Sequence, residues 1–252
     1  LDQLATAIRD RRVAGGALLM PLPDVIININ EDDGVEVAFD DGNSGSRALV
    51  AEFMVLANTI AASYVADREV PGLFRGQDVP HKRLFEGLQR DLFLNFRQRR
   101  FLRPAKITTR AQPHSCVGVM QYTTMTSPIR RLLDLIMQHQ IMSMVRGQGA
   151  AFQEYELESL IAEITRVQSR ANLVKRQRFR YWLLKYLEPL VGERLEALIV
   201  NRGQRRINVV LTDILMEADL PISPGVRAEP GTTVKVKVAQ AKPLDDLLRL
   251  EW

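Results

Sequence analysis

The pattern of hydrophobic and polar positions predicts strands near both ends of the chain and long helices between them. Residues 25–29 and 35–39 are hydrophobic runs on either side of an acidic stretch that contains Gly34, a pattern typical of a β-hairpin. Short strands separated by turns, which are typical of a small β-barrel, are expected in the tail beyond residue 192. The alternating runs of this tail are residues 198–200, 207–211 and 234–238.

Three stretches in the middle of the chain have helical spacing. After the hairpin, Ser46 or a neighbour can cap a long helix. The expected core stripe of that helix is Leu49, Phe53, Leu56, Ala57 and Ile60. Residues 80–101 show the same periodicity, and a last helical run covers about 154–187. A cationic face on this last run either lines an RNA channel or faces water, and its polar residues are Arg166, Arg170, Gln177 and Arg180.

Residues 122–135 read Tyr-Thr-Thr-Met-Thr-Ser-Pro-Ile-Arg-Arg-Leu-Leu-Asp-Leu and place two cations at the start of a predicted helix. Ser127 is a good N-cap and Pro128 fits the first helical position, which puts Arg130 and Arg131 in the first turn. A cation there opposes the helix dipole by roughly 0.3–1 kcal/mol. Free N–H groups at a helix start are also suited to phosphate. Either an anion binds here, or Asp134 holds both arginines in an ion-paired cap, and the residues alone favour neither.

Composition places the chain among globular proteins and gives it a cationic surplus. It has 252 residues, of which 46% are hydrophobic and 25% charged, and its net charge is +4. No run approaches the roughly 20 consecutive apolar residues of a membrane span, so no membrane contact is expected. The single cysteine, Cys116, fits a reducing compartment. We therefore expect a cytoplasmic protein with an acidic partner.

The cations concentrate between residues 81 and 110, where Phe96 and Phe101 lie among them. Cations that follow phosphates, together with rings that stack on bases, are typical of binding to single-stranded nucleic acid. The alternative is a solvated face whose aromatic side chains lie in the core. The cationic residues of this run are Lys82, Arg83, Arg90, Arg97, Arg99, Arg100, Arg103, Lys106 and Arg110.

Three motifs in this order and spacing resemble the ribonuclease II family. Residues 50–58 resemble its Val-x-Glu-Phe-Met-x-Leu-Ala-Asn helix, and residues 71–75 resemble its Pro-x-Leu-Tyr-Arg segment. Residues 122–135 resemble its Tyr-Thr-x-x-Thr-Ser-Pro-Ile-Arg-Arg-x-x-Asp-Leu signature. The resemblance implies an α+β fold, with the C-terminal portion of a mixed helix and sheet nuclease domain over residues 1–190. A small all-β OB-type RNA-binding barrel is expected over residues 191–252.

The resemblance also implies a hydrolytic, processive exoribonuclease that releases 5′-nucleoside monophosphates from the 3′ end of single-stranded RNA. Arg130 matches the first arginine of the signature and is expected to contact the scissile phosphate, while Asp134 orients the arginines. The residues expected to position the RNA backbone, or the helix that holds Arg130, are Tyr122, Thr126, Ser127 and Arg131. The resemblance places His114 near the active cleft. In the basic run, Arg99 and Arg100 are further expected RNA contacts.

One part of the family pattern has no match in this sequence. The family holds its catalytic magnesium on a cluster of aspartates, and no such run occurs here. The stretch that follows Leu1 resembles the middle of the nuclease domain. We therefore expect the Mg²⁺ ligands on an N-terminal segment of the same protein, of which this chain is a processed, cleaved or split part. The alternatives are a catalytically inactive RNA-binding module on a nuclease scaffold and, ranked third, a structural partner of an acidic protein.

The last helical run carries a second departure from the family. Where the family has an acidic Glu-Arg-Asp run before a Trp-Leu pair, residues 175–183 read Lys-Arg-Gln-Arg-Phe-Arg-Tyr-Trp-Leu. Arg176 therefore occupies a region in which the family has a glutamate beside the active site. The expected consequence is tighter phosphate binding or altered product release.

Overall fold

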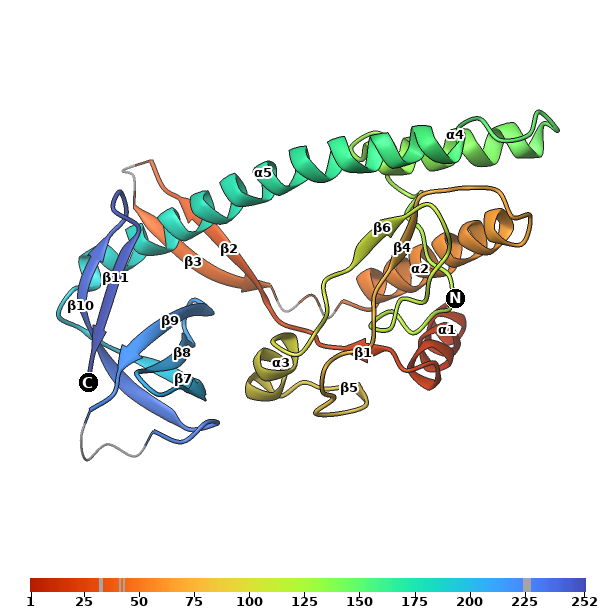
Figure 1. The fold of residues 1–252 in the computed structure, drawn as a ribbon. Helices are drawn as coiled ribbons and strands as arrows, with labels where there is room; N and C mark the ends of the chain where they lie inside the picture. The colour runs from red at the N-terminus through yellow and green to blue at the C-terminus, as the bar shows by residue number, and fades with distance from the viewer. Residues whose placement is uncertain (32–33, 41, 43, 224–227) are drawn as a thin grey trace. The chain divides into compact units, whose positions relative to one another are not determined.

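The computed structural model describes residues 1–252 with the exception of 32–33, 41, 43 and 224–227. Its contacts divide into two compact units that interleave along the chain (Figure 1). Unit 1 comprises Leu1–Pro21, Asn43–Arg90 and Gln98–Gln168, and unit 2 comprises Leu22–Gly42, Asp91–Arg97 and Ser169–Trp252. The expected domain boundary near residue 190 stays a prediction.

Helices dominate unit 1. They are α1 (Asp2–Ala14), α2 (Gly45–Ala66), α4 (Leu132–Val145) and the first part of α5 (Glu154–Leu187). Two pairs of short strands join the loops. Strand β1 (Leu18–Leu19) pairs in parallel with β5 (Gly87–Leu88), and β4 (Phe74–Gly76) pairs antiparallel with β6 (Lys106–Thr108). The buried apolar core of this unit is formed by Ala62, Val65, Leu73, Phe74, Ile136, Met137 and Leu157.

Unit 2 contains a five-stranded antiparallel sheet that nearly closes into a barrel. The strand order is β11-β10-β7-β8-β9, and the edge strands β9 and β11 also contact each other. The strands are β7 (Arg194–Arg202), β8 (Arg206–Leu211), β9 (Met216–Pro221), β10 (Thr233–Lys242) and β11 (Leu247–Glu251). The small barrel that the alternating tail predicts is confirmed.

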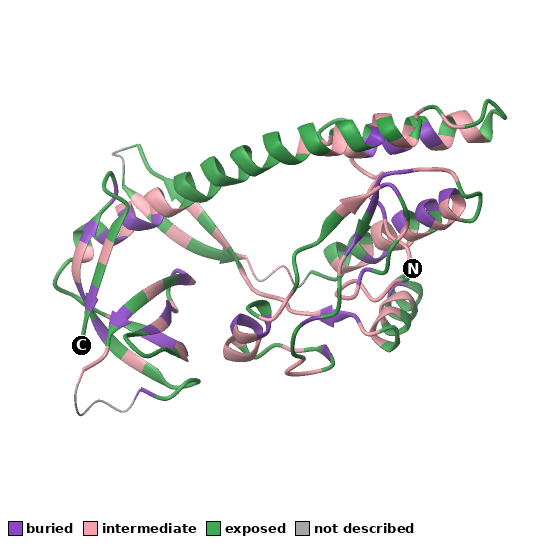
Figure 2. Cartoon of the chain, in the orientation of Figure 1, coloured by how far each residue is buried: buried purple, intermediate pink, exposed green. Residues whose placement is uncertain are grey.

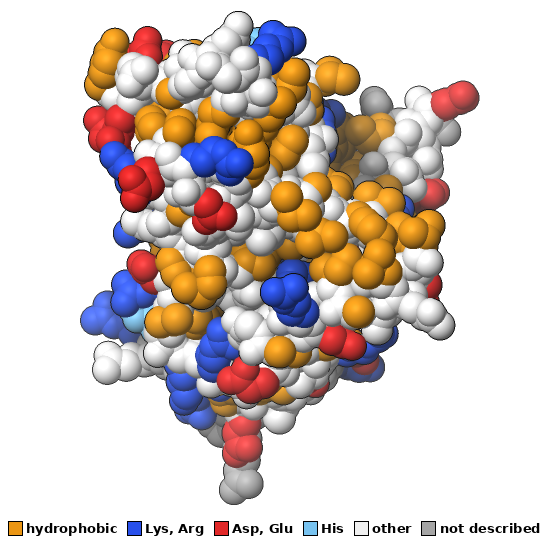
Figure 3. Space-filling model, turned by 90° about the vertical axis from the view of Figure 1, so that its right-hand side faces the viewer, with side chains coloured by type: hydrophobic (Ala, Val, Ile, Leu, Met, Phe, Trp, Pro, Cys, Tyr) orange, Lys and Arg blue, Asp and Glu red, His pale blue; other side chains and the backbone are white. Residues whose placement is uncertain are grey.

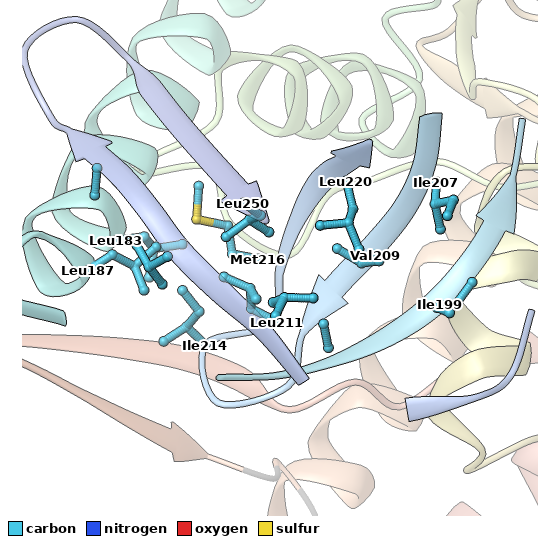
Figure 4. Close-up of a cluster of buried hydrophobic side chains, with 14 of the residues drawn as sticks. Leu183, Leu187, Ile199, Ile207, Val209, Leu211, Ile214, Met216, Leu220 and Leu250 are labelled. Carbon is cyan, nitrogen blue, oxygen red and sulfur yellow. The ribbon is translucent and has the colours of Figure 1, made fainter. Parts of the chain in front are cut away.

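Hydrophobic side chains fill this barrel (Figure 4). Ile199, Val209 and Leu211 point inward from neighbouring strands and are fully buried. Leu183 and Leu187, at the end of α5, pack into the same cluster, so the helix and the barrel share one core. A short 3-10 helix, Glu188–Leu190, connects the two.

The predicted hairpin is confirmed as β2 (Asp24–Ile29) paired with β3 (Val35–Asp40), with Ile29 opposite Val35. One face of the hairpin packs on the barrel core, because alternate side chains of a strand point to the same side. The residues of that face are Val25, Ile27 and Val37. Part of the acidic turn between the strands lies outside the described residues.

The helix predicted over residues 80–101 is wrong for its first half, since only α3 (Leu92–Arg99) forms. Gly87 has a positive φ of 65°, which a right-handed helix does not allow. The fully buried Gln98 instead holds the preceding loop, because its Oε1 accepts the Leu84 N–H at 2.7 Å and its Nε2 donates to the Lys82 carbonyl at 2.9 Å. Phe96 is 4% exposed and packs with Val200 and Val210, so its predicted stacking on RNA bases is also wrong.

Helix α2 forms as predicted and is capped by a neighbour of Ser46, but its buried face differs from the prediction. Ser44 is the N-cap and accepts the Arg47 N–H at 3.2 Å. Ala57 is exposed, as is Ile60, at 60% of its surface. The buried residues of the helix are Glu52, Asn58, Ala61, Ala62 and Val65. Hydrophobic spacing alone did not predict that Glu52 and Asn58 are buried. A polar side chain is buried only where a hydrogen-bond partner satisfies it, and apolar spacing does not reveal such a partner.

Helix α5 has the predicted bounds and contributes to both units. Its central stretch, residues 165–179, is exposed on all sides, as the run of green turns in Figure 2 shows. Val167, Leu173 and Val174 are among these exposed residues. The two ends of α5 pack into the cores of their own units, whereas the side chains of its cationic middle are exposed.

Candidate functional site

The turn before α4 carries the two arginines of the signature. The prediction that a helix begins at Pro128 is wrong, because α4 begins at Leu132 with Arg131 as its N-cap residue. The Ser127 carbonyl accepts the N–H groups of Arg130 and Arg131, at 3.3 and 3.0 Å, and closes a turn over residues 128–130. Arg131 then has an extended backbone, with φ −131° and ψ 112°, which separates the turn from the helix. Both arginines still lie next to the positive end of α4.

Asp134 holds this turn from inside the unit. Its carboxylate is fully buried, and Oδ2 accepts the Ser127 N–H at 2.9 Å and Arg131 Nη2 at 2.7 Å. The predicted ion pair with Arg131 is therefore present, whereas the hydrogen bond found for the Arg130 guanidinium is to Ser127 Oγ, at 3.3 Å. Within the described part of the chain, Asp134 Oδ1 and Arg131 Nε are buried without a hydrogen-bond partner.

Asn58, on α2, holds the loop that leads into the turn. Its Oδ1 accepts the Met125 N–H at 2.9 Å, and its Nδ2 donates to the Tyr122 hydroxyl oxygen at 3.2 Å. The carbonyl of Met125 accepts from Gln138 Nε2 of α4 at 2.7 Å. Asn58 itself is 2% exposed, and the loop is fixed to two helices at once.

Strand β4 fixes the start of the same loop. The Arg75 N–H donates to the Tyr122 carbonyl at 2.8 Å, and the buried Thr123 hydroxyl donates to the carbonyl of Leu73. Together with the contacts of Asn58, Gln138 and Asp134, these bonds anchor residues 122, 123, 125 and 127. The loop is therefore built as a rigid support for the turn that follows it.

His114 lies beside this loop and not in solvent. It is 8% exposed, and its ring meets the Tyr122 ring edge to face, with 5.5 Å between the ring centroids. Burial, and after it the positive charge of Arg75, lower the pKa of His114 from 6.5 to about 4. The imidazole is therefore neutral at pH 7, and it supports Tyr122 from within the protein.

The predicted site residues fall into three places. Tyr122, Thr126, Ser127, Arg130, Arg131 and Asp134 come together in the loop and turn before α4. Of these, Arg130 is exposed and its neighbour Ile129 fully so, while Arg131 is half-buried. Arg99 and Arg100 are exposed at the end of α3, and Arg176 is exposed on the part of α5 that belongs to unit 2.

Sequence reasoning missed Asn58 and Gln138 as parts of the site. Asn58 ends the Val-x-Glu-Phe-Met-x-Leu-Ala-Asn motif, and its polar character within an apolar helix was the signal that could have found it. Glu52 of the same motif is also buried, and it accepts two hydrogen bonds from Arg12 of α1, at 2.6 and 2.9 Å. The two polar residues of the motif thus hold two different segments against α2.

The exposed side of α2 faces a groove of about 720 Å³ between α1, α2 and residues 118–121. Apolar residues such as Ile8, Leu56, Ile60 and Met120 line it. Figure 3 shows hydrophobic side chains exposed in groups on one side of the molecule, with separate cations and acids between them. By length and composition alone, α2 is apolar enough to cross a membrane, although Glu52 and Asn58 are satisfied within unit 1 as in the core helix of a folded domain.

The turn offers an anion two guanidinium groups, a hydroxyl and the positive end of a helix. The family model of the RNB domain matches residues 1–147. The chain belongs to the ribonuclease II family. An uncharacterized ribonuclease of Synechocystis is 29% identical over 99% of this chain. The chloroplastic/mitochondrial ribonuclease II of Arabidopsis thaliana is 26% identical over 90% of this chain.

Solved structures of two ribonucleases and of a pseudonuclease have the same fold. An active-site mutant of the Dss1 exoribonuclease from Candida glabrata covers all of this chain with a TM-score of 0.83 at 22% identity. Mycoplasma genitalium RNase R, in complex with ribose-methylated single-stranded RNA, covers 99% with a TM-score of 0.83 at 15% identity. Yeast Ssd1, a pseudonuclease, covers 87% with a TM-score of 0.61 at 11% identity.

The chain spans only part of these proteins. It covers 38% and 28% of the two relatives and 34%, 48% and 32% of the three structures. Because structures named for an exoribonuclease and for a pseudonuclease both have this fold, the fold alone does not decide catalysis.

Proposed function

We propose that this member of the ribonuclease II family is part of an exoribonuclease that hydrolyses single-stranded RNA from its 3′ end to 5′-nucleoside monophosphates. Within it, the turn before α4 binds the RNA backbone, and Arg130 contacts the scissile phosphate. The RNase R neighbour was solved with single-stranded RNA, which supports RNA as the ligand class.

One observation carries this proposal. Arg130 is exposed on a turn whose supporting loop is anchored at residues 122, 123, 125 and 127 by buried partners. A guanidinium group held in position in this way stabilises the negative charge on a phosphate without a prior rearrangement of the protein. Removing one such preorganised donor typically lowers the rate on the order of 100-fold.

The other predicted residues have supporting roles in this proposal. Thr126, Ser127 and Arg131 shape the turn, and Asp134 orients Arg131 directly and Arg130 through Ser127. Tyr122 contacts the RNA backbone, and His114 acts by supporting the Tyr122 ring. Arg99, Arg100 and Arg176 are proposed as further contacts to phosphates, because exposed guanidinium groups bind them without regard to base sequence.

The residues of this turn do not fit a magnesium ion, although the family implies one. Magnesium takes oxygen ligands, chiefly carboxylates, whereas the turn presents guanidinium groups and N–H donors. The one carboxylate there, that of Asp134, is fully buried, and its Oδ2 is committed to Ser127 and Arg131. We therefore assign no step of the reaction to a metal on these residues. The proposed Mg²⁺ ligands belong to an N-terminal segment of the same protein.

A second candidate is an RNA-binding module without catalysis. The likeness of the fold to a pseudonuclease favours it, as does a turn composed of binding groups. Such a module would bind single strands with a marked salt dependence and would cleave none of them. A cytoplasmic location also stays a prediction, since one relative is named for chloroplasts and mitochondria.

The test begins with the intact mass of the natural polypeptide and of any chain that copurifies with it. The same preparation is then assayed with magnesium on single-stranded RNA labelled at the 3′ or the 5′ end. Stepwise release of nucleotides from the 3′ end, lost in Arg130→Ala and kept in Arg146→Ala, is the expected result. RNA binding without cleavage in the presence of an aspartate-bearing segment would favour the module instead.

A further inference from the structure

We infer that Asn58 is a positioning residue that sets the direction of the Tyr122 hydroxyl proton, so that Tyr122 donates a hydrogen bond to an RNA phosphate oxygen. The inference rests on the proposed RNA site and names the residue that prepares it. Asn58 is on α2, 64 residues before Tyr122 in the chain, and no RNA contact by Asn58 itself is involved.

The orientation of the Asn58 amide follows from its partner on the loop. The Met125 backbone N–H lies 2.9 Å from one amide atom of Asn58, and an N–H group can only donate. The atom that faces it must be the oxygen. The amide nitrogen therefore faces Tyr122, at 3.2 Å from the hydroxyl oxygen.

This orientation decides what the Tyr122 hydroxyl can do. An amide nitrogen donates and does not accept, so the hydroxyl oxygen must be the acceptor in this pair. The proton of the hydroxyl then points elsewhere, and no acceptor for it is found among the described residues. Tyr122 is half-buried, so the hydroxyl is left as a donor for a ligand.

The carbonyl of Met125 accepts a hydrogen bond from Gln138 Nε2 at 2.7 Å, and this bond further restricts the orientation of the Asn58 amide. Met125 is thereby fixed on both sides of its backbone, and the Asn58 amide cannot rotate without breaking the Met125 bond. A free hydroxyl can rotate to either role, whereas this one has a single role. Phosphate oxygens accept and do not donate, so the fixed role suits an RNA backbone.

The most direct test replaces Asn58 by the isosteric aspartate. In Asn58→Asp, one carboxylate oxygen still accepts the Met125 N–H, and the other faces Tyr122. A carboxylate only accepts, so Tyr122 must turn its proton inward and is lost as a donor to RNA. The full natural polypeptide is titrated with labelled single-stranded RNA at pH 8 in EDTA, which keeps the carboxylate ionised and prevents cleavage.

We expect Asn58→Asp to keep the protection of the Met125 amide against hydrogen exchange and to weaken RNA binding about tenfold or more. Tyr122→Phe should weaken it equally, and the double variant should be no weaker than either single variant. Asn58→Leu, which removes both hydrogen bonds, should lose the Met125 protection as well. This separates the role of Asn58 in positioning from its role in folding.

A matched control is the same chemical change at Gln140, a fully buried amide on α4. Gln140 bonds the backbone of Pro71 and Phe152, away from the signature loop. Gln140→Glu should lower the thermal midpoint and leave RNA affinity unchanged.

If Asn58→Asp does not fold, NMR of the unsubstituted protein decides instead. The Asn58 side-chain amide protons should be protected and should shift on Tyr122→Phe, and amide protons without that response would contradict the inference.

The outcomes distinguish this inference from the proposed function. If Arg130→Ala and Tyr122→Phe weaken RNA binding but folded Asn58→Asp binds RNA like the unsubstituted protein, the inferred proton direction is wrong and the RNA site remains. If none of the three changes affects RNA binding, the proposed site itself is wrong, and the inference falls with it.

Discussion

The carboxylate of Asp134 accepts the backbone N–H of Ser127 at 2.9 Å, across seven residues of chain. The same oxygen accepts from Arg131 at 2.7 Å, and the carboxylate is fully buried. One side chain of α4 therefore fixes both ends of the turn that exposes Arg130. The shape of this turn depends on a buried charge that has only two partners among the described residues.

Asp134→Asn should destabilise the protein by about 1–3 kcal/mol, because an amide leaves the half-buried Arg131 guanidinium without its charge partner. RNA affinity should fall with it, since the turn loosens. Urea unfolding measures the first effect and RNA titration the second. The control is Glu163→Gln, which breaks the exposed pair with Arg166 and should change stability by less than about 0.5 kcal/mol. Equal stability losses in the two variants would contradict the role of Asp134.

The pKa of His114, lowered to about 4, makes stability depend on pH. The unfolded chain regains the ordinary value of 6.5 and binds a proton between pH 6.5 and 4, which the folded protein does not. The stability that comes from burying a neutral imidazole is therefore fully present above pH 6.5 and is lost as pH falls toward 4. Between pH 6.5 and 5 the loss should be about 1.5 kcal/mol.

Urea unfolding at several pH values measures this slope, with two histidine variants for comparison. His114→Gln should flatten the slope between pH 6.5 and 5, whereas His139→Gln, at an exposed position, should leave it unchanged. A slope that survives His114→Gln would show that the imidazole is not the group responsible.

Gly118 should tolerate no side chain, because α1 approaches it closely. A Cβ atom there would lie 2.2 Å from the Arg12 carbonyl oxygen and 2.7 Å from the Ala17 nitrogen. Gly147 has a similar positive φ, 71° against 75°, but a Cβ there would meet nothing within 4 Å. Gly147→Ala should lower the free energy of unfolding by about 1 kcal/mol, through backbone strain alone. Gly118→Ala should lower the free energy of unfolding clearly more. Equal thermal midpoints for the two variants would contradict the close approach of α1 to Gly118.

Arg176→Glu should weaken binding of single-stranded RNA and reduce its salt dependence, if this exposed residue of α5 neutralises a phosphate. Each phosphate contact on a single strand contributes about 0.7 to the slope of log affinity against log salt. Arg146→Glu, at the C-terminal end of α4, makes the same change of charge as a control. Unchanged RNA affinity and turnover in Arg176→Glu would remove the role proposed for this position.

Much of the fold could be predicted because it depends on local patterns. The alternation of the tail predicts the barrel, and the apolar spacing of residues 154–187 predicts α5. The start of α4 could not be predicted in this way. Ser127 and Pro128 have good capping propensities, but a buried bond from Asp134 holds Ser127 in a turn instead. Residues 80–91 likewise have helical spacing, yet Gly87 and the buried amide of Gln98 favour a loop.

The site was only partly predictable for the same reason. Arg130, Arg131 and Asp134 stand together in one motif, so the sequence places them together. Asn58 lies on a helix, 64 residues before Tyr122 in the chain. Hydrophobic spacing does not predict that an amide side chain is buried there. The burial of His114 and Phe96 also depends on segments distant in the chain.

The measurement that tests the central claim most directly is the affinity of the full natural polypeptide for 5′-labelled single-stranded RNA between 50 and 200 mM salt, in EDTA. Arg130→Ala is compared with Arg146→Ala, at the other end of α4. If the turn before α4 binds an RNA phosphate, Arg130→Ala weakens binding and lowers the salt slope by about 0.7, while Arg146→Ala changes neither. If Arg130→Ala has the affinity and slope of the unsubstituted protein, this turn is not the RNA site.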